Sequence, residues 1–434
     1  MKRMFGGIVL LAVLSVPVAA QDTMAVTPVV TLAEALERSA RLDPDYVGAL
    51  GTVESAEWGR RAARLAFILP SVSVGLDVTK YSSGFFNLGT GELQSTSVTA
   101  RADARYELFS LRKLAELSRA GAALDAANAD EARARFAAAL LTEQEYYAVL
   151  AGHELLASAE QQVQRAEEGL KVARARVASG AVVQSDSLQL VLDLTRARVE
   201  LLRQRAALEV AQLNLGRRVG SDRSVDAAPI DTAPPPELPI DDAAALTMAV
   251  EQGPDYRVAR ADERAADAVL RAQRSDYFPT VNLSGAHQRF DSKFFPSARA
   301  VSSVTLGFSW PLWSSGQREV AVAEARTRSN VARAIRADLE RGARADVTEA
   351  LAAYRTARAS VVLSQTALVV AKENYRVQES RYRAGAATIL DLRDAQVDLA
   401  QAEAELVQAR YGTRLALAGL EAMLGRRLFS DDSE

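Results

Sequence analysis

One unit occurs twice in this chain, and the duplication limits the possible folds more than any other feature. Three motifs recur at an offset of 205 to 210 residues: Pro-Asp-Tyr at Pro44 and Pro254, a glycine turn at Gly180 and Gly385, and Leu-Gly-Arg-Arg at Leu215 and Leu424. We therefore expect two copies of one supersecondary unit, at 21–228 and 241–428, that pack in equivalent ways. The proline-rich segment 229–240 between them cannot continue a helix and is predicted to be an extended linker.

Long helices are predicted to make up most of each copy. The expected order is a first helix, two strands, a very long helix, a turn and a shorter helix. The helices are expected at about 32–66, 111–178 and 187–216 in the first copy and at about 242–276, 317–384 and 388–424 in the second. No proline interrupts either of the very long helices. At a rise of 1.5 Å per residue, each of them would extend about 100 Å.

The last helix of each copy carries a regular apolar seam. In the second copy, leucine and alanine alternate in steps of three and four residues, at Leu392, Ala395, Leu399, Ala402, Leu406 and Ala409. The seam of the first copy has the same register when it is shifted by 205 residues. This spacing is typical of a coiled coil, and alanine at every second position allows a close approach of the partner helix. We therefore expect two equivalent helical hairpins.

Two short segments of alternating character follow the first helix of each copy. The four predicted strands lie at about 71–80, 98–108, 280–289 and 301–310. In the second of them, an apolar set alternates with the charged set Arg101, Asp103, Arg105 and Glu107. A strand with one apolar and one charged face is half-buried. Either the sheet covers an ordinary soluble core, or it faces lipid on one side and water on the other, as in an outer-membrane barrel.

The membrane interpretation requires several chains. Each strand has about the length that a tilted strand needs to cross a bilayer. Aromatic side chains gather at one end of the strands, as in an interfacial girdle, at Tyr106, Phe109, Trp310 and Trp313. Four strands cannot close a barrel, and open sheet edges do not occur in the hydrocarbon region. We therefore expect several chains to combine their strands into one sheet.

The N-terminus and the charge pattern narrow the possible locations and partners. Residues 1–20 are expected to be a secretory signal peptide, because Lys2 and Arg3 precede a short apolar core. The 52 basic and 55 acidic residues are interspersed, which does not indicate a nucleic-acid partner. The chain has no cysteine, so an exported protein of this kind must be stabilised by packing or by oligomerisation.

Nothing in the sequence indicates catalysis. The two histidines, His153 and His287, lack further ligands at the spacing of a zinc motif. The chain has no thiol, no glycine-rich phosphate loop and no Gly-x-Ser-x-Gly motif. We expect no enzyme activity, no metal site and no cofactor, so the energy for any transport must come from a partner.

With these elements in place, the chain resembles the TolC-like outer-membrane efflux proteins, also called outer membrane factors. The resemblance covers the duplicated unit, and its most specific local match is YRAGAATILDLRDAQVDLAQAEAELVQARY at 382–411. It implies a mainly α-helical protein with membrane β-strands. Three chains would form a homotrimer in which a twelve-stranded outer-membrane β-barrel continues into a periplasmic α-helical tunnel.

The resemblance also implies two groups of functional residues. The glycine turns would lie at the periplasmic tip, where a membrane-fusion adaptor docks, together with Arg176 and Arg381, which precede Gly180 and Gly385 by four residues. Family members hold this tip shut by contacts between neighbouring hairpins. The matching residues in this chain are Tyr382 and Asp186, and the resemblance also implies that Asp391 and Asp394 face the pore axis at the closed end of the tunnel, as part of the gate. The chain differs from the family pattern at Ala387, where a basic residue can help to lock the gate.

Asp391 and Asp394 allow two interpretations. Acids in the first turn of a helix interact favourably with its positive end, and they are common there. In a trimer, however, each position becomes a ring of three carboxylates, and such rings favour cations in narrow pores. Like charges held close together also raise the pKa of some of their members. The gate interpretation is the one that the duplicated architecture favours.

These observations together predict a passive exit duct in the cell outer membrane. It would conduct small molecules, such as drugs, toxic compounds or metal ions, from an inner-membrane pump (RND-type or ABC transporter) and a periplasmic adaptor to the exterior. Its expected partners are two further copies of the chain, these two proteins and outer-membrane lipid. The outer-membrane component of a type I protein secretion system is an alternative. A periplasmic coiled-coil adaptor or scaffold is a second alternative, but it would not need lipid-facing strands.

Overall fold

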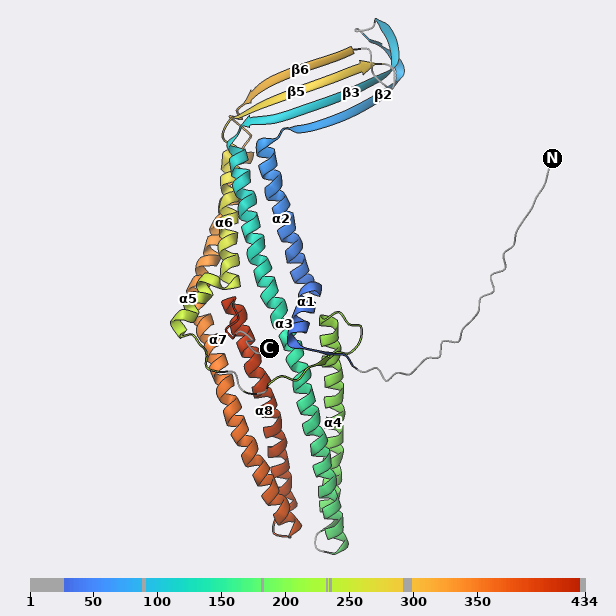
Figure 1. Cartoon of the computed structure of the whole chain (residues 1–434), viewed down its shortest axis with the longest axis vertical. Coiled ribbons are helices and arrows are strands. Elements are labelled where there is room, and N and C mark those ends of the chain that lie inside the picture. Colours follow the sequence, from blue (N-terminus) through green and yellow to red (C-terminus); the bar gives the residue numbers. More distant parts are fainter. Residues whose placement is uncertain are drawn as a thin grey trace, which may run out of the picture.

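The computed structural model describes residues 27–87, 91–180, 183–231, 233, 236–291 and 299–429. The molecule is elongated, with a β-sheet at one end and the turns of two helical hairpins at the other (Figure 1). The predicted signal peptide and residues 430–434 of the C-terminal tail lie outside the described residues. Within the described part of the chain, no helix combines the length and the apolar character needed to cross a membrane.

The first helix of each copy is interrupted, and the prediction of one continuous helix was wrong. The chain forms α1 (Leu32–Leu42) and α2 (Pro44–Ile68) in the first copy, and α5 (Asp242–Gln252) and α6 (Pro254–Ser275) in the second. The proline that begins each second helix lacks an N–H group and clashes with a preceding helical turn. Asp43 caps the new helix by accepting hydrogen bonds from the backbone amides of Asp45 and Tyr46.

Four antiparallel strands form one sheet in the order β2-β3-β5-β6. They are β2 (Ser71–Asn87), β3 (Glu92–Phe109), β5 (Thr280–Asp291) and β6 (Arg299–Ser309). The first two strands are longer than expected, because pairing resumes beyond an irregularity between Lys80 and Phe85. A separate short pair joins β1 (Val29–Val30) and β4 (Asp226–Ala227) in parallel.

The strand register gives the sheet one polar and one apolar face. Arg105 of β3 lies opposite Ser71 of β2 and Ser284 of β5, and Ser284 lies opposite Thr305 of β6. The neighbouring residue on β3, Ala104, lies opposite Val72 of β2 and Gly285 of β5, and Gly285 lies opposite Val304 of β6. Directly paired residues point to the same side of a sheet. Because β2 and β6 are edge strands, each has one side without a partner strand among the described residues.

Two hairpins of long helices make up the other end of the molecule. The first hairpin pairs α3 (Leu111–Ala178) with α4 (Gln184–Arg218), and the second pairs α7 (Gln317–Arg383) with α8 (Ile389–Leu424). Both seams are buried or half-buried along their length, as the heptad pattern predicted. Ala166, Leu170 and Leu194 pack together in the first hairpin, and their counterparts 205 residues later, Ala371, Tyr375 and Leu399, pack together in the second.

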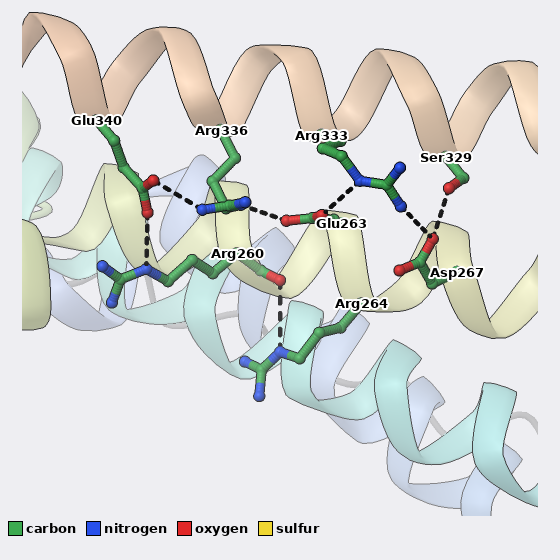
Figure 2. A network of polar contacts seen from close by, with 8 residues as sticks. All are labelled: Arg260, Glu263, Arg264, Asp267, Ser329, Arg333, Arg336 and Glu340. Carbon is green, nitrogen blue, oxygen red and sulfur yellow. Dashed lines mark hydrogen bonds and ion pairs between the residues drawn. The ribbon is translucent and has the colours of Figure 1, made fainter.

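Polar contacts attach α6 to the upper part of α7 (Figure 2). Glu263 of α6 forms ion pairs with Arg333 and Arg336 of α7, and the Nε of Arg333 lies 3.2 Å from its carboxylate. Arg336 also pairs with Glu340 at 2.7 Å, and Glu340 in turn pairs with Arg260 of α6. Each charge in this row therefore has a partner of opposite sign, which fixes the register of the two helices.

Candidate functional site

The two hairpins are joined near their tips by Arg176 of α3 and Tyr382 of α7. The Arg176 guanidinium stacks 4.7 Å from the centre of the Tyr382 ring, and its Nη1 donates a hydrogen bond of 2.5 Å to the Tyr382 carbonyl oxygen. The Tyr382 side chain is almost completely buried, at 1% exposure. A cation that stacks on an aromatic ring and also binds the backbone is held at several points. We call this contact the tip latch.

The arginines predicted at the two tips differ in their contacts. Arg176 reaches across to the other hairpin, whereas Arg381 donates a hydrogen bond of 3.2 Å to the Ala386 carbonyl in its own turn. Both turn glycines have left-handed backbones, with φ of 75° at Gly180 and 82° at Gly385. A Cβ at Gly385 would lie only 3.4 Å from Nη2 of Arg176, so the latch passes directly beside this turn.

Asp186 lies within electrostatic range of Tyr382, and the two side chains do not form a hydrogen bond. The Tyr382 hydroxyl is buried and has no hydrogen-bond partner in the described part of the chain. Burial raises the pKa of Tyr382, and the charge of Asp186 adds to the increase, while Arg176 opposes it. The structure thus brings Tyr382, Asp186 and Arg176 together, although the sequence had assigned Arg176 to adaptor docking only.

Asp391 serves as a helix cap. Its carboxylate accepts hydrogen bonds from the Thr388 backbone amide at 2.8 Å and from the Thr388 hydroxyl at 2.7 Å. The Asp391 amide in turn donates to the Thr388 hydroxyl, which completes a capping box. These hydrogen bonds, and secondarily the charge of Arg381, lower the pKa of Asp391. The helix-end interpretation therefore applies to Asp391 in the single chain.

Asp394 lies one helical turn further along α8 and is exposed. No hydrogen bond or ion pair joins it to another residue in the described ranges. The two acids are three residues apart on the same helix, so both project from one side of α8. Of the pair, Asp394 is the acid whose carboxylate has no ion-pair or hydrogen-bond partner among the described residues.

Several ion pairs between the hairpins were not predicted from the sequence. Glu403 of α8 binds Arg165 of α3 at 3.0 Å and accepts a hydrogen bond from the Ser158 hydroxyl. Both charged side chains are largely buried, at 17% exposure for Arg165 and 10% for Glu403. Further contacts join the same two helices through Glu154, and Arg393 of α8 reaches Asp193 of α4 at 2.7 Å. The sequence does place charged residues beside the seams at heptad spacing, but this pattern does not show which residues form ion pairs with one another.

The surface that α8 covers on α3 has an uncovered counterpart on α7. The residues that correspond to Ser158 and Arg165 after a shift of 205 are Leu363 and Val370, which are 70% and 63% exposed. α4 makes no comparable contact with α7 within the described chain. The position on α4 that corresponds to Val407 of α8 is Leu202, which is also exposed. Exposed apolar patches of this kind mark interaction surfaces.

Comparison with known proteins identifies the family. The sequence profile of the family described as "Outer membrane efflux protein" matches residues 35–221 and 245–426, which is most of the chain. Protein CyaE of Bordetella pertussis is 30% identical over 299 residues, a match that covers 66% of this chain and 62% of that protein. The pyoverdine export outer membrane protein OpmQ of Pseudomonas putida is 26% identical over 417 residues, covering 88% of this chain and 83% of that protein.

Solved structures have the same fold. The Campylobacter jejuni CmeC outer membrane channel superposes with a TM-score of 0.78 at 15% identity, covering 93% of this chain and 87% of that chain. The outer membrane protein VceC of Vibrio cholerae superposes with a TM-score of 0.76 at 19% identity, covering 92% and 97%. The TolC-like resemblance and the outer-membrane location are thereby confirmed. The chain belongs to the outer membrane efflux protein family, whose members are transport channels and not enzymes.

Proposed function

We propose that three copies of this chain form an outer-membrane channel that serves as the exit duct of a tripartite efflux system. The observation that carries the proposal is the sheet with one polar and one apolar face and with two unpaired edges. Such edges must be paired within a membrane, and three chains of four strands would give a closed sheet of twelve. The apolar face would then contact lipid and the polar face would line the lumen.

The duplicated hairpins support the same assembly. Within one chain, α8 of the second copy packs against α3 of the first. The equivalent contact for the remaining helices is between α4 of one chain and α7 of the next. This contact would cover Leu363, Val370 and Leu202, whose exposure in a single chain is otherwise unexplained. Repeating both contacts around an axis closes a tunnel of helical hairpins.

The hairpin tips are proposed to form the closed gate of this tunnel. The tip latch holds the second hairpin against the first, and Asp186 lies within electrostatic range of Tyr382. Opening requires the α7–α8 tip to move away from α3, which breaks the latch and the pair of Arg393 with Asp193. Above these contacts, the buried pair of Arg165 with Glu403 provides a fixed point about which the tip can move.

The acids on α8 are proposed to select among solutes at the gate. Asp394 carries an uncompensated charge, so three copies would form a carboxylate ring that favours cations. Asp391 contributes its charge to the same region while it caps α8.

Docking of an adaptor is proposed at the exposed turns around Gly180 and Gly385, with Arg381 presented at the surface and Arg176 retained in the latch. Small molecules are the proposed cargo, because a relative of this chain, OpmQ, is named for the export of pyoverdine. An inner-membrane pump of the RND or ABC type would supply the energy, since the outer duct is passive in this proposal.

Conductance across a planar bilayer tests this function. The purified wild-type protein should give small, mostly closed conductances, because the latch holds the tips together. Arg176→Ala and Tyr382→Ala should increase the open time, and Asp394→Asn should reduce cation preference without that increase. Arg381→Ala is the matched control for the latch and should leave the open time unchanged. A protein that never conducts in any of these forms, and that remains soluble without detergent, would overturn the proposal.

A further inference from the structure

The apolar face of the sheet changes character along its length. At the end where the strands join the helices, aromatic side chains are anchored to the helix ends. The Tyr106 hydroxyl donates a hydrogen bond of 3.0 Å to the Phe67 carbonyl, and Trp310 Nε1 donates one of 3.2 Å to the Tyr277 carbonyl. At the other end, the same face carries cations, Lys80 on β2 and Arg289 on β5. The two ends of the lipid-facing surface therefore have different chemistry.

The register assigns both cations to the apolar face. Arg289 lies opposite Ala100 of β3, which lies opposite Leu76 of β2. Lys80 follows Val78 by two residues on the same strand, and it therefore points to the same side as Leu76 and Val78. Neither Lys80 nor Arg289 forms a hydrogen bond or ion pair with a residue of the described ranges, and both are exposed. Two unpaired cations thus project from the outer end of a face that is mainly apolar towards the helices.

Both cations also lie at the same height above the helices. Lys80 is the ninth residue after Ser71, where β2 begins, and Arg289 is the ninth residue after Thr280, where β5 begins. Nine residues of a strand extend about 30 Å, or about 22 Å along the membrane normal at a tilt of 45°. The apolar band of such a sheet is about 25 Å tall. The two cations therefore coincide with the outer boundary of the hydrocarbon region.

A polar pair adjoins Arg289 on this face. His287 lies two residues before it on β5, and its Nδ1 is 2.8 Å from the hydroxyl oxygen of Ser302 on β6. Below this pair, towards the helices, the face is apolar again, with Val304, Leu306 and Phe308 exposed on β6. A ligand for the whole surface must therefore combine an anionic head with apolar chains that lie along the strands below it.

We infer that Lys80 and Arg289 bind the phosphate groups of an anionic lipid in the outer leaflet of the membrane. This inference depends on the proposed membrane-spanning assembly, in which the apolar face contacts lipid. An arginine binds phosphate through two parallel N–H groups, and lysine contributes a point charge. An anionic protein partner would not account for the apolar surface immediately below the cations. Three chains would present the pair three times around the sheet.

Native mass spectrometry of the detergent-purified assembly with lipid A, a bis-phosphorylated lipid, tests this inference. The wild type should bind lipid A more tightly than phosphatidylcholine. Each lost charge near an anionic surface should weaken binding about fivefold, so Lys80→Gln with Arg289→Gln should weaken it about 25-fold. Lys80→Arg with Arg289→Lys should retain binding, because both charges remain. The matched control is Arg105→Gln on the polar face, which should bind like the wild type.

Three results would overturn the inference. They are unchanged lipid A binding by Lys80→Gln with Arg289→Gln, an equal loss in Arg105→Gln, and complete displacement of the lipid by inorganic phosphate at the same concentration. Planar-bilayer conductance of the same variants separates this inference from the proposed channel. Variants that conduct normally but bind lipid A like the wild type contradict the lipid site alone, whereas a chain that never assembles or conducts contradicts the channel.

Discussion

The two helical hairpins have matching seams but different surroundings. The first, α3 with α4, is covered on one side by α8, and α3 buries fifteen of its residues. In the described part of the chain, no helix of the first hairpin covers α7 in the same way, and α7 buries nine residues although α3 and α7 have almost the same length. The hairpins are therefore equivalent in their internal packing, and they differ in which outer face is already occupied within one chain.

The outer faces of α3 and α7 differ in the kind of side chain that they present. Where α8 covers α3, the contact includes Ser158, Arg165 and Glu403, which form buried polar interactions. At the equivalent positions on α7, which no described residue covers, the side chains are Leu363 and Val370. Ion pairs fix the register of two helices of the same chain, while an apolar surface favours association with another molecule. The duplication thus supplies one contact within the chain and leaves its counterpart for a neighbouring chain.

The largest effect is expected where the uncovered face is given a charge. Leu363→Glu would bury an unpaired carboxylate at each contact between chains, at a cost of about 3–5 kcal/mol per contact. The assembly should dissociate into single chains, as measured by light scattering in detergent. Leu363→Met, which conserves volume, should leave the mass unchanged. A Leu363→Glu protein that keeps the wild-type mass would show that this face is not buried between chains.

The second-largest effect is expected in the free energy of unfolding when a buried ion pair is broken, in comparison with an exposed one. Glu403→Ala leaves Arg165 buried without its partner and should destabilise the protein by about 3 kcal/mol, as measured by urea unfolding of the helices. The equivalent position of the first copy is Arg198, which pairs with Glu167 at an exposed site. Arg198→Ala should therefore cost less than about 1 kcal/mol in the free energy of unfolding. Equal losses of unfolding free energy in the two variants would show that the buried and the exposed ion pair stabilise the protein equally.

A smaller, local effect is expected at the tips. Arg176→Ala removes a stacked cation and one hydrogen bond, worth together about 2 kcal/mol, and it should widen the distance between spin labels on the two tips. Arg381→Ala removes only contacts within its own hairpin and should leave that distance unchanged. An unchanged distance in Arg176→Ala would mean that the latch does not hold the hairpins together.

The smallest effect concerns the first turn of the returning helices. α8 begins with the capping box of Thr388 and Asp391, whereas the residue before α4, Val183, provides no side-chain cap. Thr388→Ala should lower the local stability of the first turn of α8 by about 1 kcal/mol, measured by amide hydrogen exchange.

The same turn should also respond to pH. Because hydrogen bonds lower the pKa of Asp391, its stabilising contribution is present above the usual pKa of a carboxyl group and is lost as the pH falls through the lowered value. The protection factors of the amides in the first turn of α8, which are corrected for the intrinsic pH dependence of exchange, should therefore fall on acidification, and those in the first turn of α4 should show no such change from a side-chain cap. Identical pH profiles for the two turns would contradict this difference.

The parts of this structure that follow from sequence are those governed by local periodicity. The seam from Leu392 to Ala409 and the alternation around Arg105 both depend on the spacing of residues within one element. The tip latch depends on how two elements 206 residues apart are placed, and many arginines could have filled the role of Arg176. The break before Pro44 was missed although its local signal, Asp43 followed by proline, was present. An aspartate at the start of a helix, such as Asp391, is compatible with a helix cap and with a pore lining, so the sequence alone does not decide between the two roles.

Cross-linking of introduced cysteines tests most directly whether α4 of one chain packs against α7 of the next. The chain has no cysteine, so any thiol product comes from the introduced pair. Arg198→Cys with Leu363→Cys reproduces, between chains, the contact of Glu403 with Ser158 within one chain. A short bis-thiol reagent applied to this protein in membranes should give covalent products of two and three chains, with no larger species. Products confined to single chains, or a series extending beyond three, would contradict a closed assembly of three chains.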